Sequence, residues 1–362
     1  MGTIQKLFNF SRTSVSFFAL SLTAQRTWML SRSCSSFSSE TQAVNPSMLR
    51  HLVSKITATG PITVAEYMRE VLTNPVSGYY VKNDMLGADG DFITSPEISQ
   101  IFGELLGIWC VSEWMAAGKP KTFQLVELGP GRGSLTSDVL RVFGQLQSVL
   151  CGASVSVHLV EVSPKLSQVQ AHCLVGENTQ ADEQRQHVEV CAEGGVIVQK
   201  LANRISEDGG AALIADYGHS GTKTDTFRGF KGHKLHDVLE APGRADLTAD
   251  VDFNYLRKMA GDAVVCFGPI TQRAFLKNMG IDTRLQVLLK SCKDSSTRAQ
   301  LVHGYSMLTE PEKMGHRFQF LSMLHPSRLS QPEEEKGGMA RTRKKKVLAP
   351  LPVAGFTELG LN

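Results

Sequence analysis

The stretch Phe123–Leu135, FQLVELGPGRGSL, constrains the fold of this chain more than any other part of the sequence. The apolar run Phe123–Val126 is followed by Glu127 and then by glycines at positions 129, 131 and 133. Apolar residues then recur at the spacing of one helix face, which predicts a strand, a tight glycine turn and a helix. Such a turn brings backbone N–H groups and a helix N-terminus against a ligand, because glycine has no Cβ in the way.

The spacing of the glycines indicates which ligand to expect. Gly129, Gly131 and Gly133 follow the pattern G-x-G-x-G, whereas dinucleotide-binding turns follow G-x-G-x-x-G, so an NAD-dependent oxidoreductase is disfavoured. The pattern resembles the first motif of class I S-adenosylmethionine methyltransferases. That resemblance implies that the three glycines line the cofactor and that Glu127 helps to place its amino-acid end. Taken alone, the motif is also compatible with a strand-to-helix turn that binds nothing.

A second apolar strand, predicted at Val155–Glu161, ends in a carboxylate. A carboxylate at the tip of the second strand can accept hydrogen bonds from both hydroxyls of a ribose. Glu161 is therefore the expected ribose ligand, and its position after the glycine turn favours a cofactor site over a plain turn.

Composition and cysteine spacing narrow the class of protein. The chain has 362 residues, a hydrophobic fraction of 42% and a formal net charge of +3, which describe a globular protein with ample core and no signature of a nucleic-acid binder. The seven cysteines are scattered and include no C-x-x-C pair, so neither a disulfide framework nor a metal site is predicted. We expect buried free thiols. No run reaches the roughly 18 apolar residues of a membrane span.

The first 40 residues differ from the rest. They are basic and rich in serine, and they contain no Asp or Glu before Glu40, which is the composition of a mitochondrial transit peptide. A secretory signal is the alternative because Val15–Leu22 is fairly apolar. That core is short, however, and more arginines follow it.

Two helices are marked between the leader and the glycine turn. Thr63 and Glu66 have the spacing of a capping box, and a helix that starts at Ser95-Pro96 is expected to use Ser95 as its N-cap. A helix start of this kind can also bind an anionic group, so Ser95 and Glu97 are weaker candidates for the cofactor site.

Several segments together resemble the MidA-type methyltransferase family. They are GPITVAEYM (60–68), NPVSGYY (74–80), GDFITSPEISQIFGE (90–104), VELGPGRGSL (126–135), HVEV (187–190), ADYGH (215–219), LTADVDF (247–253) and KNMGI (277–281). The likeness covers nearly everything after the leader. It implies symmetric dimethylation of an arginine on a core subunit of respiratory complex I in the mitochondrial matrix, with S-adenosylmethionine as the methyl donor.

The second half of the chain fits a methyltransferase sheet. Ala211–Ala215 is an apolar strand that leads into Asp216, at the sheet edge where α/β proteins bind ligands. Asp216 could orient the acceptor arginine or the cofactor, and it could equally cap the following turn. Late strands are expected at Val264–Phe267 and Phe318–Leu324. The basic run RTRKKK at 341–346 indicates a solvated loop rather than a nucleic-acid site, because EEE precedes it at 333–335.

One interval is too short for the family pattern. Only 50 positions separate Glu161 from Ala211, and they contain none of the Glu-Phe-Phe-Asp-type sequence that the family carries at the end of a strand there. We expect that a segment with a central strand is absent near 176–186 and that the sheet is incomplete. A missing acidic motif would also weaken the grip on a guanidinium group, which needs carboxylates.

The sequence therefore predicts an α/β, Rossmann-like class I methyltransferase fold with an N-terminal helical extension. We expect a transit peptide at 1–40, a helical region at 44–120, the methyltransferase domain at 121–325 and a basic tail at 326–362. The expected function is protein arginine methylation in support of complex I assembly. The alternative is a catalytically impaired chain that acts as a non-enzymatic assembly factor.

Overall fold

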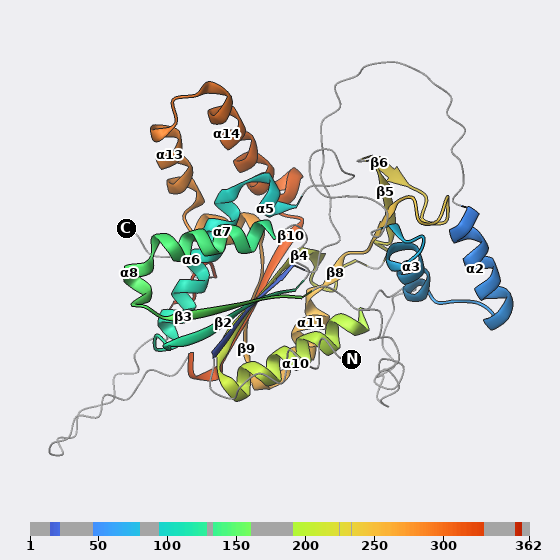
Figure 1. Cartoon of the computed structure of the whole chain (residues 1–362), viewed down its shortest axis with the longest axis horizontal. Coiled ribbons are helices and arrows are strands. Elements are labelled where there is room, and N and C mark those ends of the chain that lie inside the picture. The colour runs from blue at the N-terminus through green and yellow to red at the C-terminus, as the bar shows by residue number, and fades with distance from the viewer. Residues whose placement is uncertain are drawn as a thin grey trace.

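The computed structural model describes residues 15–21, 46–79, 94–128, 133–160, 191–223, 225–232, 234–328 and 352–356, with 15–21 described by their backbone. A seven-stranded sheet lies at the centre of the molecule, with helices on both faces (Figure 1). Its strand order is β3-β2-β1-β4-β10-β9, and β8 pairs with the end of β4. The strands β3, β2, β1 and β4 are parallel to one another, whereas β10 is antiparallel to both β4 and β9. The expected α/β class is confirmed.

Five strands of the large sheet form where apolar runs were predicted, and two others were not predicted. The large sheet consists of β1 (Val15–Ser21), β2 (Thr122–Leu128), β3 (Ser154–Val160), β4 (Gly210–His219), β8 (Val251–Asp252), β9 (Val265–Thr271) and β10 (Phe318–Leu324). The two that were not predicted are the short β8 and β1, which comes from the leader. β1 is the one at the centre of the sheet. It lies between β2 and β4, so the expected gap at the centre of the sheet is filled by a segment from a different part of the chain.

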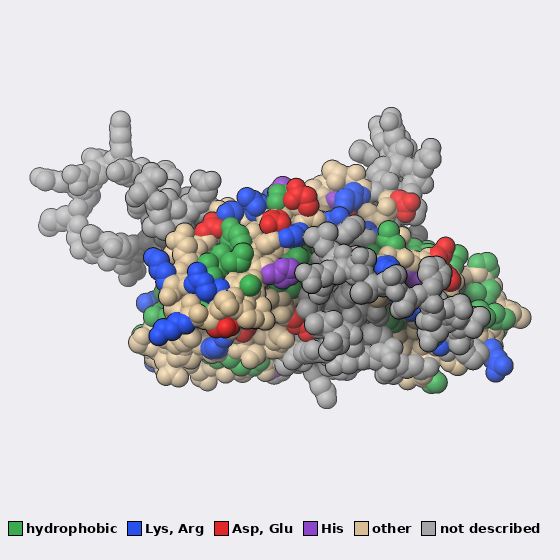
Figure 2. All heavy atoms as spheres, turned by 90° about the horizontal axis from the view of Figure 1, so that it is seen from above, with side chains coloured by type: hydrophobic (Ala, Val, Ile, Leu, Met, Phe, Trp, Pro, Cys, Tyr) green, Lys and Arg blue, Asp and Glu red, His purple; other side chains and the backbone are tan. Residues whose placement is uncertain are grey.

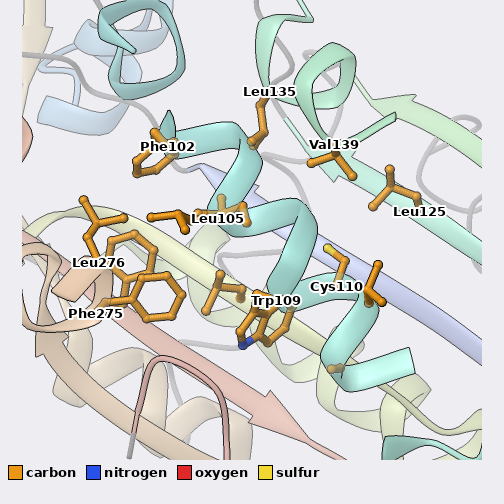
Figure 3. Packing of buried hydrophobic residues seen from close by; sticks show 14 of the residues in the cluster. Phe102, Leu105, Trp109, Cys110, Leu125, Leu135, Val139, Phe275 and Leu276 are labelled. Atoms are coloured by element: carbon orange, nitrogen blue, oxygen red, sulfur yellow. The ribbon is translucent and has the colours of Figure 1, made fainter. Parts of the chain in front are cut away.

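One face of the sheet is covered by α6 (Gln100–Ala116) and α7 (Ser134–Gln145), with the short α8 (Gln147–Leu150) after them (Figure 1). Figure 3 shows Leu105 and Trp109 of α6 lying between Leu125 of the sheet and Phe275 of α12. The two helices approach closely because α6 carries Gly103, where a Cβ would lie 2.4 Å from the Cβ of Asp138 on α7. The region predicted as an N-terminal extension thus contributes α6 to the main core.

The opposite face is covered by α10 (Ala192–Asp208) and α11 (Phe253–Ala260). Val198, Leu201 and Ile205 of α10 pack with Ala212 and Ile214 of β4 in a second hydrophobic cluster. Because β4 is buried on both faces, its sequence is a continuous apolar run without alternation, as expected for a parallel strand inside an α/β sheet.

A smaller unit lies beside the sheet. The helices α2 (Pro46–Thr59) and α3 (Val64–Thr73) pack against the three-stranded sheet of β5 (Arg228–Lys231), β6 (Lys234–His236) and β7 (Asp246–Thr248). The predicted capping box is confirmed, because Glu66 accepts a hydrogen bond from the Thr63 backbone N–H at 2.9 Å and Thr63 Oγ1 accepts one from the Glu66 N–H at 3.2 Å.

The remaining helices follow β9. They are α12 (Gln272–Asn278), α13 (Ile281–Ser291) and α14 (Ser295–Thr309), and the last two form a hairpin that extends from the body (Figure 1). None of the helices in the described part of the chain has the length and hydropathy needed to cross a membrane. On the face in Figure 2, side chains of Lys and Arg are interspersed with those of Asp and Glu. The thiols differ from expectation: Cys110 is buried, but Cys151 and Cys191 are exposed.

Candidate functional site

The predicted strand and helix are confirmed as β2 and α7, whereas residues 129–132 of the turn lie outside the described residues, and a buried carboxylate lies between the strand and the helix. Glu127 is only 3% exposed, near the end of β2, and the hydroxyl of Thr136 on α7 donates a hydrogen bond to its Oε2. Gly133 is the N-cap of α7 with a φ of 76°, in the left-handed region that favours glycine. Among the described residues, no atom lies within 4 Å of the position that a Cβ on Gly133 would take.

Three other predicted cofactor residues, Gly129, Gly131 and Glu161, lie outside the described residues. The strand register still shows where β2 and β3, the strands that precede these residues, end. Val160, the last residue of β3, is the partner of Leu128, the last residue of β2. The two parallel strands therefore end level with each other, at the edge where α7 begins. That Glu161 and the glycine turn lie together at this edge of the sheet stays a prediction.

The helix start at Ser95 differs in detail from the prediction. Thr94, not Ser95, is the N-cap, and its backbone N–H donates to the Glu97 carboxylate at 3.0 Å. The helix is also broken: α5 (Ser95–Ile98) ends after one turn, and Ser99 caps the new helix α6 by accepting from the Ile101 N–H. The sequence pattern missed the break because the apolar residues Ile98, Ile101, Phe102 and Leu105 keep the spacing of one helix face on both sides of Ser99.

Ser95 and Glu97 are both committed to contacts that hold α5 in place. Ser95 is 6% exposed, and its hydroxyl lies 3.4 Å from the side-chain oxygen of Gln272 on α12. The carboxylate of Glu97 closes the cap on Thr94. α5 packs against α7, so both residues lie on the same face of the sheet as Glu127. Their role as cofactor ligands stays a prediction.

Asp216 is buried within β4, which continues beyond the predicted strand to His219. Its Oδ1 accepts a hydrogen bond from the Tyr217 N–H at 2.7 Å, and its Oδ2 has no partner among the described residues. Burial raises the pKa of this carboxyl well above its usual range, and the charge of Asp250 raises it further, although the hydrogen bond from Tyr217 acts in the opposite direction.

The structure does not bring Asp216 and Glu127 to the same face of the sheet. Ala212 and Ile214 of β4 face α10 and α11, so alternation along the strand places Asp216 on that side too. Glu127 instead contacts Thr136 of α7, on the opposite face. His219 at the end of β4 is buried at 6% exposure, and its Nδ1 accepts a hydrogen bond from the Thr222 N–H.

A pocket of about 220 Å³ lies beside the end of β4 and the start of β10, and no sequence pattern predicted it. It is lined by Tyr217, Lys223, Arg228, Asp250, Met307, Lys313, Met314, Arg317 and Phe318. Because β10 is antiparallel to β4, its first residue lies at the same edge as the carboxyl ends of the parallel strands. The lining residues come from three stretches of the chain, 217–228, 250 and 307–318, which is why no local motif could identify them.

The charge of this pocket is mainly positive. Among the described residues that line it, Asp250 is the one acidic side chain, and it accepts from Lys223 at 2.7 Å and from Arg228. Burial alone would raise the pKa of Asp250, but these two cations outweigh burial and lower it. A carboxylate already paired with two cations is a poor receptor for a third, so the pocket favours an acidic group over a guanidinium group.

Comparison with known proteins identifies the family. A family model described as S-adenosyl-L-methionine-dependent methyltransferase matches residues 105–184 and 176–270. A relative named "Protein arginine methyltransferase NDUFAF7, mitochondrial" from Danio rerio is 58% identical over 420 residues, which take in 91% of this chain and 96% of the relative. The Homo sapiens relative of the same name is 50% identical over 401 residues, covering 86% of this chain and 90% of the relative.

A solved structure supports the fold. The crystal structure of a Burkholderia thailandensis protein bound to S-adenosyl-homocysteine has a TM-score of 0.61 and 19% sequence identity, and it covers 77% of this chain and 92% of its own. The resemblance inferred from the motifs is thereby confirmed at the level of the family. Together with the β2–turn–α7 unit and its buried Glu127, these matches show that the chain belongs to the S-adenosyl-L-methionine-dependent methyltransferases.

Proposed function

We propose that this chain transfers a methyl group from S-adenosylmethionine to an arginine of a protein substrate in mitochondria. The observation that carries the proposal is the unit of β2 and α7, in which the buried Glu127 precedes the glycine sequence and Gly133 begins α7 in the left-handed region. The enzyme class follows from the family. The arginine acceptor and the compartment are taken from the names of relatives that are 50–58% identical to this chain.

The residues present fit the cofactor. Glu127 would hold the ammonium of its amino-acid end, Gly129, Gly131 and Gly133 would allow the backbone close to it, and Glu161 would hold the ribose. When bound, S-adenosylmethionine supplies a methyl group on a positively charged sulfur. The part of the protein in the reaction is then to position the acceptor nitrogen and to keep water away, since in-line transfer depends mostly on positioning.

We further propose that the acceptor belongs to a core subunit of complex I and that the reaction takes place in the mitochondrial matrix. The first 40 residues support import, because a basic, acid-free leader is attracted by the membrane potential. The methylated product would be symmetric dimethylarginine, as the family resemblance implies.

A second candidate, a non-catalytic factor that binds its client, is favoured by one observation. Among the described residues that line the pocket beside β4, Asp250 alone is acidic, and it is already paired with Lys223 and Arg228. The sequence also lacks the acidic motif expected between Glu161 and Ala211. Such a factor would keep the cofactor site and lose turnover.

The two candidates are separated by one experiment on the full chain. The protein is incubated with S-adenosylmethionine carrying a radioactive methyl group and with complex I intermediates from cells that lack the Homo sapiens relative. Labelled symmetric dimethylarginine after acid hydrolysis supports methyl transfer. Binding of S-adenosylhomocysteine without label supports the non-catalytic factor. Absence of both contradicts the cofactor site itself.

A further inference from the structure

The centre of the sheet is occupied by a strand from the leader. Val15–Leu20 pair with Phe123–Leu128 of β2, and Ser16–Ser21 pair with Gly210–Ala215 of β4, parallel on both sides. Strand β1 therefore contributes a full ladder to each neighbour. The leader was expected to be a targeting segment, so this placement calls for a physical explanation.

The comparisons indicate that the relatives contain a segment which this chain lacks. The alignment with the Danio rerio relative spans 420 positions, but 91% of 362 residues is about 329, so about 90 aligned positions have no residue of this chain. The alignment with the Homo sapiens relative spans 401 positions, and 86% of 362 residues is about 311. About 90 aligned positions again have no residue of this chain. The family model also matches in two stretches that overlap at 176–184. The alignment lengths give the size of the absent segment, and the overlap at 176–184 places it between β3 and α10.

A sheet without this segment would have a vacant strand position. Neighbouring strands lie about 4.8 Å apart, so β2 and β4, which flank one strand, are about 10 Å apart and cannot pair directly. With β1 in place, the residues along both edges are buried: Leu125 and Leu213 are each 2% exposed, and Ala212 and Ile214 are not exposed at all. Buried backbone N–H and C=O groups without partners cost about 1–3 kcal/mol each. The position must therefore be filled or the sheet must rearrange.

The requirements for an occupant are specific. It must run parallel to β2 and β4, extend for about seven residues, and be apolar along most of its length, because helices cover both faces of the sheet. The leader sequence VSFFALS meets these requirements, and the rest of the leader is richer in polar and basic residues. Addition of a strand from elsewhere in the sequence is an established way to complete a sheet.

We infer that the space between β2 and β4 is a strand-binding site and that Val15–Ser21 is its occupant, in place of the strand carried by the absent segment. The sheet of this chain is complete only while the leader is attached, because Val15–Ser21 form its central strand. This inference concerns the architecture and does not depend on methyl transfer.

The replacement restores backbone pairing without restoring acidic groups. The residues that follow β1, Leu22-Thr23-Ala24, include no carboxylate, and the sequence has none before Glu40. The strand of the relatives is expected to end in an acidic motif at this edge of the sheet. The leader strand therefore completes the scaffold of the cofactor site while leaving the acceptor side without those carboxylates.

Hydrogen exchange on the unaltered full chain tests the inference directly. In a central parallel strand every amide is bonded to one neighbour or the other, so the amides of 16–21 should exchange at least about 100-fold more slowly than in a free peptide of the same sequence. They should also match the protection of β2 and β4. Exchange of these amides at the rate of the free peptide, with β2 and β4 protected, would overturn the inference.

A second test asks whether the leader stays bound after the chain is cut. A protease site is inserted after Ser36, between β1 and α2, and the folded protein is cleaved there. If β1 lies in the sheet, the leader fragment co-elutes with the body in gel filtration and separates only in denaturant. A fragment that separates under native conditions would contradict the inference.

A matched pair of variants completes the design. Ala19→Pro removes a backbone N–H from the middle of β1 and should lower the melting temperature or abolish cooperative unfolding. Ser35→Pro makes the same change in the leader but outside the strand, and it should leave unfolding as in the unaltered chain. Equal behaviour of the two variants would overturn the inference, whichever way they behave.

Discussion

Replacement of Glu127 by glutamine should weaken cofactor binding far more than it weakens the fold. Glu127 is 3% exposed, so solvent does not screen its charge, and its Oε2 accepts a hydrogen bond from Thr136. Glutamine keeps the shape and an oxygen that can accept from the same hydroxyl. The free energy of unfolding should therefore change by less than about 1 kcal/mol, as is usual when a hydrogen bond is retained.

The loss in affinity follows from the charge. A hydrogen bond to a charged group contributes about 1.5–3 kcal/mol, and each 1.4 kcal/mol is tenfold in affinity. Glu127→Gln should thus raise the Kd for S-adenosylhomocysteine by about 10- to 150-fold. Isothermal titration calorimetry measures that ratio, and chemical unfolding in urea checks that the fold is intact.

The control is Glu310→Gln, which removes one negative charge at the far end of α14 and should leave the Kd unchanged. If Glu127→Gln binds the ligand as tightly as the unaltered chain, Glu127 does not contact the amino-acid end of the cofactor. If both variants weaken binding equally, the effect is one of net charge and the assignment of Glu127 is wrong.

Three further predictions concern stability. Asp216→Asn should raise the melting temperature at pH 7 and have no effect near pH 4. Burial raises the folded-state pKa of Asp216, so the charged carboxylate lowers stability above the unfolded pKa of about 3.9. A gain in melting temperature that is independent of pH from 4 to 8 would refute this. Arg328→Met should cost about 3–5 kcal/mol in urea unfolding, because Glu113, 2.9 Å from Arg328 Nε, would stay buried without its partner, and adding Glu113→Gln should recover part of the loss. Gly103→Ala should lower the free energy of unfolding by about 1–3 kcal/mol, because the new Cβ would push α6 away from Asp138 on α7. Gly144→Ala should not lower it, because no described atom lies within 4 Å of its new Cβ.

The elements that carry local patterns were predicted well from the sequence. The apolar runs gave β2, β3, β4, β9 and β10, and the glycine turn gave the start of α7. The capping box of Thr63 and Glu66 fixed the start of α3 because its hydrogen bonds join residues only three apart. Each of these signals lies within a short window of sequence, where propensity and periodicity act.

The features that were missed depend on distant parts of the chain. β1 was not predicted, because its place is set by β2 and β4, more than 100 residues away, and its own composition indicates a targeting segment. The break between α5 and α6 was hidden by an apolar stripe that continues on both sides of Ser99. The face of β4 on which Asp216 lies could not be read either, since both faces of this strand are buried and the sequence shows no alternation.

The central claim is that the β2–turn–α7 unit binds S-adenosylmethionine, and thermal unfolding of the full chain with S-adenosylhomocysteine tests it most directly. The full chain is needed because β1 comes from the leader. The ligand at 100 times its Kd should add about 2.7 kcal/mol to the free energy of unfolding and raise the melting temperature, while NAD at the same concentration should not. A melting temperature unchanged by S-adenosylhomocysteine, or raised by NAD instead, would contradict the account.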